Sequence, residues 1–413
     1  MGQDDLLWVS KAACKPRLET SLHQLVIIAA SSRRTFEVDV LRGVALLGIA
    51  VVNVPIFSEP WTGMPAVETH LDALCALIVG TFFIAKFFGL FAFLFGWAMV
   101  RMRESTISKG RDARRIWRRR MFVLFGIGLA HAILVFPFDI LMIYGILGLI
   151  LSNAPTWSRE RLMKHALYGL LAVPISYFLL TWWMAASFDD YQPYEGEKYG
   201  VYSYALLVEY NFYTLGYCQL VNVLYNGAMS HAAICLGILA SREGFFDKNS
   251  PVFSVLEKKA PLLWIVGITF NLPYGIVCAL NDETITALDA FVMAMAGIGA
   301  PWLTAAYVVT ITSWVRRRMV GGFFAAAGKM SLTAYVLEGI LAGWLFYEYG
   351  LGWNMEFGAA ATLVSALGIF VAIKLFCMAW LRFHKQGPLE LIWRKIVEMK
   401  ADPNTTGTKP SAS

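Results

Sequence analysis

Ten stretches of this 413-residue chain are long and apolar enough to suggest helices that cross a lipid bilayer. Such a helix needs about 20 mostly apolar residues. Hydrophobic residues make up 58% of the chain and charged residues only 15%, whereas soluble proteins carry about 25% charged residues. This composition excludes a disordered chain, a nucleic-acid-binding module and an ordinary cytosolic enzyme. It predicts an all-α fold, a polytopic membrane helix bundle of about ten transmembrane helices.

The predicted spans are Leu41–Ser58, Leu77–Val100, Met121–Phe136, Ile140–Leu151, Leu162–Ala185, Leu215–Ala240, Pro261–Leu280, Ala287–Trp314, Phe323–Tyr347 and Ala359–Leu381. The third and fourth spans are short and form a hairpin around Pro137, because proline stops one helix and allows the next to begin.

Basic residues in the loops predict the orientation. The segment Arg101–Arg120 carries nine Lys and Arg residues, and such residues collect in cytoplasmic loops. Alternation from this loop predicts that both termini are cytoplasmic and that the tip of the hairpin, at Asp139, faces outward. The expected location is the inner (plasma) membrane.

The chain divides into three predicted parts. Residues 1–35 form an N-terminal extension that we expect to be poorly ordered, residues 36–395 form the transmembrane domain, and residues 396–413 form a disordered cytoplasmic tail. The six cysteines include no CxxC pair. We interpret them as small buried hydrophobic residues, with no disulfide framework and no metal site.

Ionisable residues inside apolar segments are the informative positions, because each costs roughly 2.5–3.5 kcal/mol at the middle of a spanning helix. Asp39 and Arg42 open the first span and share one helix face. They form either a local ion pair at the interface or a binding site for an anionic group. Asn53, three turns further on, either binds a neighbouring helix or belongs to a site.

His70 lies in the outward segment before the second span. Imidazole is suited to general-base chemistry near neutral pH, although a histidine in a loop is commonly just solvated. Lys86 lies within the second span and needs a carboxylate or water as its partner, with Asp139 and Glu338 as candidates. His131 is most simply a buried, hydrogen-bonded core residue, and Asp139 is either exposed at the hairpin tip or functional.

Four ordered motifs resemble those of a known family. The opening stretch 39–53 reads DVLRGVALLGIAVVN; Lys86-Phe87 is followed by LFAFLFG; and the stretch ending in His131 is followed by Asp139 and Tyr144. The fourth motif is Gly328-Lys-Met-Ser-Leu-Thr-Ala-Tyr335 with Gly387-Pro388-Leu-Glu390. Together they resemble the bacterial YeiB-like proteins, the family of domain of unknown function 418, whose defining region corresponds to about 240–395. Glu338-Gly339 stands where that family often has Gln-Ser.

The opening motif is also similar to that of heparan-alpha-glucosaminide N-acetyltransferase, a transmembrane acyltransferase. This similarity implies transfer of an acyl group from cytosolic acyl-CoA, as a co-substrate with no permanently bound cofactor, to a carbohydrate or envelope acceptor on the far side. It implies that Asn53 and His70 are catalytic. We expect Asp39, Arg42, Lys86, Asp139, Tyr144 and Glu338 to bind substrate or cofactor.

Two other classes stay open. Lys86, Asp139 and Glu338 would form a proton or substrate path in a transporter, and the polar residues would serve helix packing alone in a membrane scaffold. The expected partners are the lipid bilayer, acyl-CoA and its acceptor, with no nucleic acid, and a homo-oligomer is compatible with the sequence.

Overall fold

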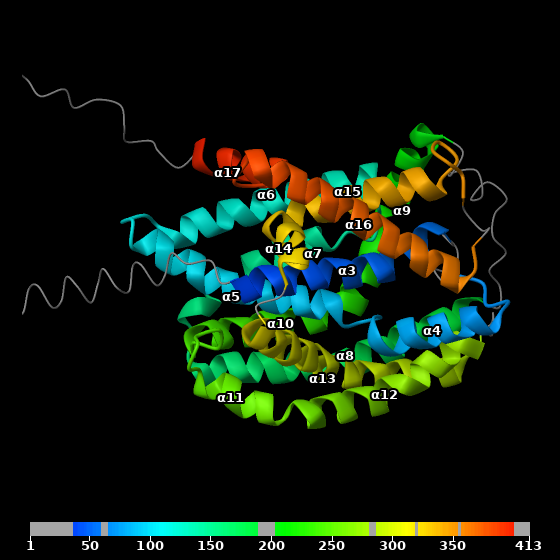
Figure 1. Ribbon diagram of the computed structural model, residues 1–413, viewed down its shortest axis with the longest axis horizontal. Helices are drawn as coiled ribbons and strands as arrows, with labels where there is room; N and C mark the ends of the chain where they lie inside the picture. The colour runs from blue at the N-terminus through cyan, green and yellow to red at the C-terminus, as the bar shows by residue number, and fades with distance from the viewer. Residues whose placement is uncertain are drawn as a thin grey trace, which may run out of the picture.

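The structure is a computed structural model that describes residues 36–58, 65–188, 203–280, 286–318, 321–353 and 357–399, and these residues form an all-α bundle (Figure 1). The helices are α3 (Phe36–Ser58), α4 (His70–Phe82), α5 (Phe87–Ile107), α6 (Ala113–Leu134), α7 (Ile140–Ile150), α8 (Arg159–Phe188), α9 (Tyr204–Asn222), α10 (Ala228–Arg242), α11 (Pro251–Lys258), α12 (Ala260–Leu280), α13 (Ala287–Arg318), α14 (Gly322–Lys329), α15 (Ser331–Phe346), α16 (Ala359–Phe383) and α17 (Pro388–Met399). A short 3-10 turn, Ala154–Thr156, precedes α8, and a π-helical turn, Val223–Gly227, joins α9 to α10.

Two of the predicted regions lie largely outside the described residues. The predicted N-terminal extension, 1–35, is not described at all. Of the predicted tail, 396–413, only 396–399 are described, and they form the last turn of α17.

Seven helical segments in the described part of the chain are long and apolar enough to cross a membrane. They are Phe36–Ser58, His70–Ile107, Arg159–Ser187, Tyr204–Arg242, Ala260–Leu280, Ala287–Arg318 and Ala359–Phe383. The other three predicted spans fall on α6, on α7 and on α14 with α15, which are not among these seven. A multi-pass architecture is therefore established, while the count of ten stays a prediction.

The outside of the bundle is apolar, as lipid contact requires. On α8, Leu167, Leu171, Ile175 and Leu179 repeat every four residues, so they share one helix face, and each is more than half exposed. A continuous exposed apolar surface of this kind is atypical of a soluble protein and indicates a membrane environment.

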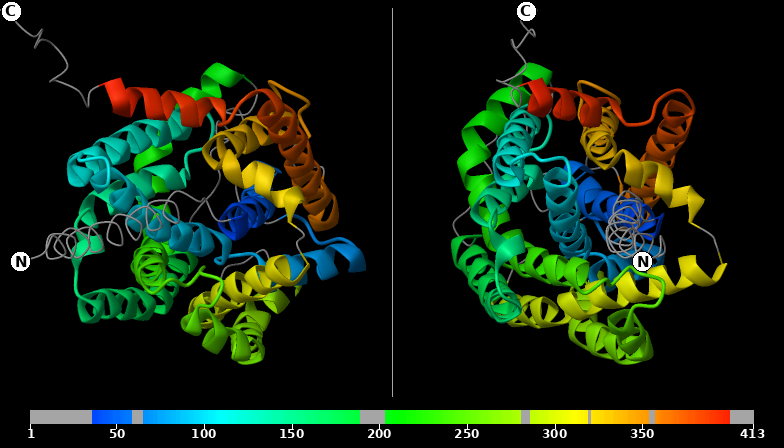
Figure 2. Two further views of the ribbon diagram at one scale, coloured as in Figure 1. Left: turned by 60° about the vertical axis from the view of Figure 1, so that its left-hand side comes forward. Right: turned by 90° about the vertical axis from the view of Figure 1, so that its left-hand side faces the viewer.

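The first span, α3, lies at the centre of the bundle, as both views of Figure 2 show. It packs against α14, α16, α15 and α5. The approach to α14 depends on two glycines that face each other's helix: Gly43 lies against the carbonyl of Phe324, and Gly328 lies against the carbonyl of Asp39. A side chain at either position would overlap these carbonyl groups, so the helices can pack this closely only because both residues lack one.

Two of the polypeptide's apolar segments are broken helices. Between α4 and α5 the chain leaves helical geometry at residues 83–86, and Ala85 adopts a φ of 70°. The carbonyls released there find donors: Lys86 Nζ donates to Gly80 O (3.2 Å), and Tyr307 Oη donates to Phe82 O (2.7 Å). The second break, at Met330, separates α14 from α15.

We call the end of the bundle where α5 and α6 meet the basic end, because their connection carries the arginine-rich segment predicted to be cytoplasmic. In Figure 1 this end lies at the left, and the start of α4 lies at the right. The sidedness of the membrane itself remains a prediction.

Candidate functional site

Asp39 and Arg42 open α3 at the basic end and form the ion pair that their spacing predicts. Arg42 Nη1 lies 3.6 Å from Asp39 Oδ1, and the Asp39 side chain is buried, whereas Arg42 is partly exposed. The pair holds the guanidinium of Arg42 at the edge of a cavity.

This cavity has a volume of about 290 Å³ and lies between α3, α5, α6, α7, α15 and α17. Four basic residues from four parts of the chain line it: Arg42, Arg120, Lys329 and Arg394. Glu390 is the only acid among its lining residues, and its carboxylate already accepts hydrogen bonds from Leu332 N (2.8 Å) and Thr333 Oγ1 (2.6 Å) at the start of α15. The cavity therefore has a positive lining at the basic end.

Arg120 is the basic residue whose surroundings most favour a ligand. Its guanidinium carbon lies 4.2 Å from the centre of the Trp393 ring, a cation–π contact. Its Nε atom is buried and has no hydrogen-bond partner among the described residues, and the same is true of Gln386 Oε1, another atom of the cavity wall. Buried polar groups are nearly always hydrogen-bonded, so these two atoms suggest a missing occupant.

One face of α3 leads from the basic end towards the middle of the bundle. Arg42, Leu46 and Ile49 line the cavity, and Asn53 follows on the same face four residues further. Asn53 Nδ2 donates to Glu338 Oε1 at 3.4 Å, and Glu338 is only 3% exposed. The structure thus brings together two predicted site residues that are 285 positions apart in sequence.

Asp139 is buried, with 0% exposure, so the interpretation of it as an exposed residue at the hairpin tip is wrong. Its carboxylate accepts from Met142 N (2.9 Å), as the N-cap of α7, and lies 2.8 Å from His131 Nδ1. Gln219 and Asn222 of α9 donate to the hairpin's backbone carbonyls, including that of Asp139. The tip is covered by α9, which is why it does not reach solvent.

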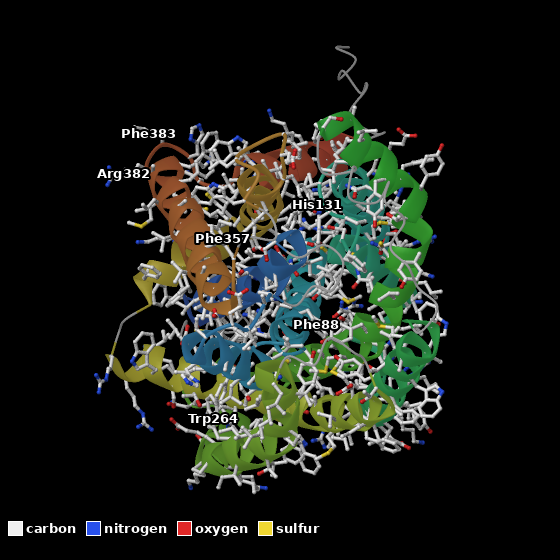
Figure 3. All side chains as sticks on the ribbon, turned by 90° about the vertical axis from the view of Figure 1, so that its right-hand side faces the viewer. Phe88, His131, Trp264, Phe357, Arg382 and Phe383 are labelled. Carbon is white, nitrogen blue, oxygen red and sulfur yellow. The ribbon has the colours of Figure 1, made fainter. Side chains whose placement is uncertain are left out.

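Sequence reasoning treated His131 as a core residue and missed its partner. The ring lies inside the bundle (Figure 3), buried against α15, with its centre 5.1 Å from that of Tyr335. Its Nε2 atom has no hydrogen-bond partner in the described part of the chain. A hairpin that reverses within residues 135–139 places the ends of its two helices side by side. This short reversal was the sequence signal that could have paired His131 with Asp139.

Tyr144 and Tyr335 mark the inner part of the cavity. Both line it and both are buried. Tyr144 Oη donates to Phe88 O (2.7 Å), and Tyr335 Oη accepts from Ile140 N (3.4 Å). Since Tyr335 contacts His131 on its other side, one tyrosine separates the cavity from the His131–Asp139 pair.

Two predicted site residues stand apart from this cluster. His70 is exposed in the first turn of α4, and among the described contacts none joins it to Asn53. Lys86 is fully buried, and its described partner is the carbonyl of Gly80 rather than Asp139 or Glu338.

The long apolar helices, the lipid-compatible surface and the buried polar cluster define a multi-pass helical membrane protein. Its residues 240–400, from the end of α10 through α17, match the family model described as "Protein of unknown function (DUF418)". This match confirms the resemblance to DUF418 proteins that is seen in the chain's motifs.

Similar proteins extend the match over almost the whole chain. The chain is 28% identical to the uncharacterized protein YxaH of Bacillus subtilis (strain 168), with 92% of this chain and 98% of that protein aligned. It is 27% identical to the uncharacterized protein YeiB of Escherichia coli (strain K12), over 91% and 99%. An uncharacterized 39.9 kDa protein of Bacillus acidopullulyticus is 25% identical, over 91% and 96%. No solved structure matches the chain significantly.

Proposed function

We propose that this protein is a membrane-bound acyltransferase that takes an acyl group from cytosolic acyl-CoA and delivers it to a carbohydrate or other envelope acceptor. The observation that carries the proposal is the cavity with basic residues at the basic end and a mostly apolar wall, which ends beside the buried polar residues around Tyr335.

The chemistry of the lining suits such a donor. Arginine binds phosphate oxygens through short, charge-assisted hydrogen bonds, and Arg42, Arg120 and Arg394 supply three guanidinium groups. The deeper wall, with Leu46, Phe91 and similar side chains, suits an apolar arm. A volume of about 290 Å³ is at the small end for ligand pockets, so it accommodates the acyl-bearing arm with the phosphates at the opening.

The roles that the resemblance implies for Asp39 and Asn53 fit this arrangement, whereas His70 lies apart from it. Asp39 orients Arg42. Asn53, at the end of the α3 face that lines the cavity, is the hydrogen-bond donor to the oxyanion that develops during acyl transfer. The resemblance gives the role of general base, which removes a proton from the acceptor, to His70, whose side chain is exposed in the first turn of α4.

Transport is the second candidate, and the paired helix breaks favour it. Discontinuous helices such as α4–α5 and α14–α15 form substrate and ion sites in many transporters. However, the buried charge at the first break, Lys86, binds the carbonyl of Gly80, so its described contact stabilises the break.

The test uses purified protein in detergent, labelled acetyl-CoA and cell-envelope extract. Arg120→Gln should weaken binding of acetyl-CoA by about tenfold to a hundredfold, because a hydrogen bond to a charged group contributes about 1.5–3 kcal/mol. The matched control is Arg118→Gln on the same helix, because Arg118 is exposed and does not line the cavity. His70→Ala tests the predicted base.

Labelled product that depends on Arg120 would support the enzyme. Equal binding by the Arg120 and Arg118 variants would contradict the proposed donor site. Uptake of solute into proteoliposomes, with no labelled product under any condition, would favour the transporter instead.

A further inference from the structure

We infer that the buried His131–Asp139 pair is the proton acceptor of the transfer reaction, with His131 as the general base and Asp139 as the residue that positions it. This inference rests on the proposed acyltransferase function and names a different base from His70.

Asp139 is held in one orientation by independent contacts. One carboxylate oxygen accepts from Met142 N at 2.9 Å, and the other lies 2.8 Å from His131 Nδ1. The side chains of Gln219 and Asn222 fix the backbone of the same residue from α9. Since a carboxylate only accepts hydrogen bonds, Nδ1 of the imidazole carries the proton and Nε2 keeps its lone pair.

That lone pair has no donor in the described part of the chain. His131 is 5% exposed, and Nε2 is buried without a partner. An unsatisfied buried polar atom costs about 1–3 kcal/mol. A histidine that is oriented by a carboxylate at one nitrogen and free at the other has the arrangement that general-base catalysis needs.

Gly339 of α15 lies directly against this nitrogen and offers it no side-chain donor. A Cβ atom built at this position would lie 2.9 Å from His131 Nε2 and 2.8 Å from a methyl carbon of Val135. A side chain at this position would overlap the imidazole, so the glycine lets α15 pack against His131 without displacing the ring.

The pair lies just beyond the inner end of the cavity, with the Tyr335 ring between them. Tyr335 and Ile140 line the inner end of the cavity, and the Tyr335 ring contacts the His131 ring at 5.1 Å between centres. One turn further along α15, Glu338 accepts a hydrogen bond from Asn53. His131 contacts Asp139 from the hairpin and Tyr335 from α15, and Glu338 precedes Gly339 on that same helix.

The proposed step balances as follows. The acceptor's hydroxyl or amine proton passes to Nε2 of His131 as the acceptor atom bonds to the thioester carbonyl carbon. The carbon–sulfur bond then breaks, and the leaving thiolate of coenzyme A takes the proton back from His131. The products are the acylated acceptor and free coenzyme A, and the histidine is regenerated.

The experiment compares His131→Gln and Asp139→Asn with two matched controls. Asp112→Asn alters another aspartate that caps a helix, at the start of α6, and His165→Gln alters a histidine outside the cluster. We expect His131→Gln to bind acetyl-CoA like the unaltered protein but to transfer its acetyl group about a hundredfold to ten-thousandfold more slowly. The residual activity of this variant should have a different pH profile from that of the unaltered protein.

Asp139→Asn provides a second variant in case His131→Gln does not fold. Its amide can still cap α7 but does not hold the same imidazole tautomer, so transfer should fall while donor binding stays unchanged. Both controls should keep full transfer.

Two results distinguish a failure of this inference from a failure of the proposed function. If His131→Gln transfers at the full rate while His70→Ala is inactive, His70 is the base and this inference is overturned alone. If the unaltered protein neither binds acetyl-CoA nor forms product, the proposed function fails and the inference fails with it.

Discussion

Individual charged side chains inside the bundle are each stabilised by a local partner. Lys86 donates to the carbonyl end of α4, where a cation also complements the helix dipole. Asp139 accepts from the first turn of α7 and from His131. These contacts offset the cost of roughly 2.5–3.5 kcal/mol for a charge in a membrane. Glu338 differs, because its described partner is the neutral amide of Asn53.

Glycine substitutions test packing at the same scale. Gly237 of α10 lies against the carbonyl of Phe93, whereas Gly126 of α6 faces open space. Gly237→Ala should lower the free energy of unfolding by about 1–3 kcal/mol, because the added methyl group overpacks the contact. Gly126→Ala should leave stability unchanged or raise it by up to about 1 kcal/mol, because alanine favours helices. Tryptophan fluorescence during heating in detergent measures both.

A similar loss of stability in the two variants would mean that helix propensity or lipid contact, rather than the α5–α10 approach, decides the effect. Gly216→Ala repeats the control on α9, where a Cβ atom also meets open space.

At the scale of elements, α17 acts as a wall of the cavity and as a cap for another helix. Glu390 receives hydrogen bonds from Leu332 N, Thr333 N and Thr333 Oγ1 at the start of α15, and Trp393 packs on Arg120. These hydrogen bonds stabilise the break at Met330 between α14 and α15, although α17 lies about 60 residues later in the chain. A change in α17 should therefore affect both stability and the ligand site.

Glu390→Ala should lower the unfolding free energy by about 1–3 kcal/mol, because a charge-assisted cap of α15 is lost. It should also weaken binding of acetyl-CoA, since α17 carries Arg394 and Trp393 at the cavity. Glu390→Gln should be milder, because its carbonyl oxygen still accepts. Heating in detergent and titration with acetyl-CoA give the two readouts.

The control is Glu160→Ala, an exposed acid in the first turn of α8 whose partner is Lys164. If the two alanine variants were equally stable, α15 would not depend on the cap.

The whole molecule is a bundle around α3 whose basic end gathers the arginine-rich segments. A basic cavity mouth at this end suits a ligand that arrives from the cytoplasm, the side on which the arginine-rich segments are predicted to lie. Both ends of the bundle carry exposed residues in the described part of the chain. Each end can therefore be labelled at an introduced cysteine.

Single cysteines in a cysteine-free background test this orientation. Ser108→Cys, in the connection between α5 and α6, should react with a membrane-impermeant maleimide only after the cells are permeabilised. Glu68→Cys, just before α4, should react in intact cells, because positively charged loops stay inside. Labelling of residue 108 from outside would reverse the topology and remove the cytosolic donor from the proposal.

The amino-acid sequence by itself determined the membrane class, the position of most long helices, the Asp39–Arg42 pair and the resemblance to DUF418 proteins. These properties depend on local composition and on spacings of a few residues. It did not reveal that Arg42, Arg120, Lys329 and Arg394 line one cavity, that Asn53 meets Glu338, or that Asp139 is buried against His131.

Only the tertiary structure decided those contacts, and the physical reason is the solvent. In a bilayer, apolar helix faces are equally compatible with lipid and with protein, so hydropathy marks which helices cross but not which faces meet. The meeting faces are chosen by close glycine contacts, helix breaks and single hydrogen bonds between residues far apart in the chain.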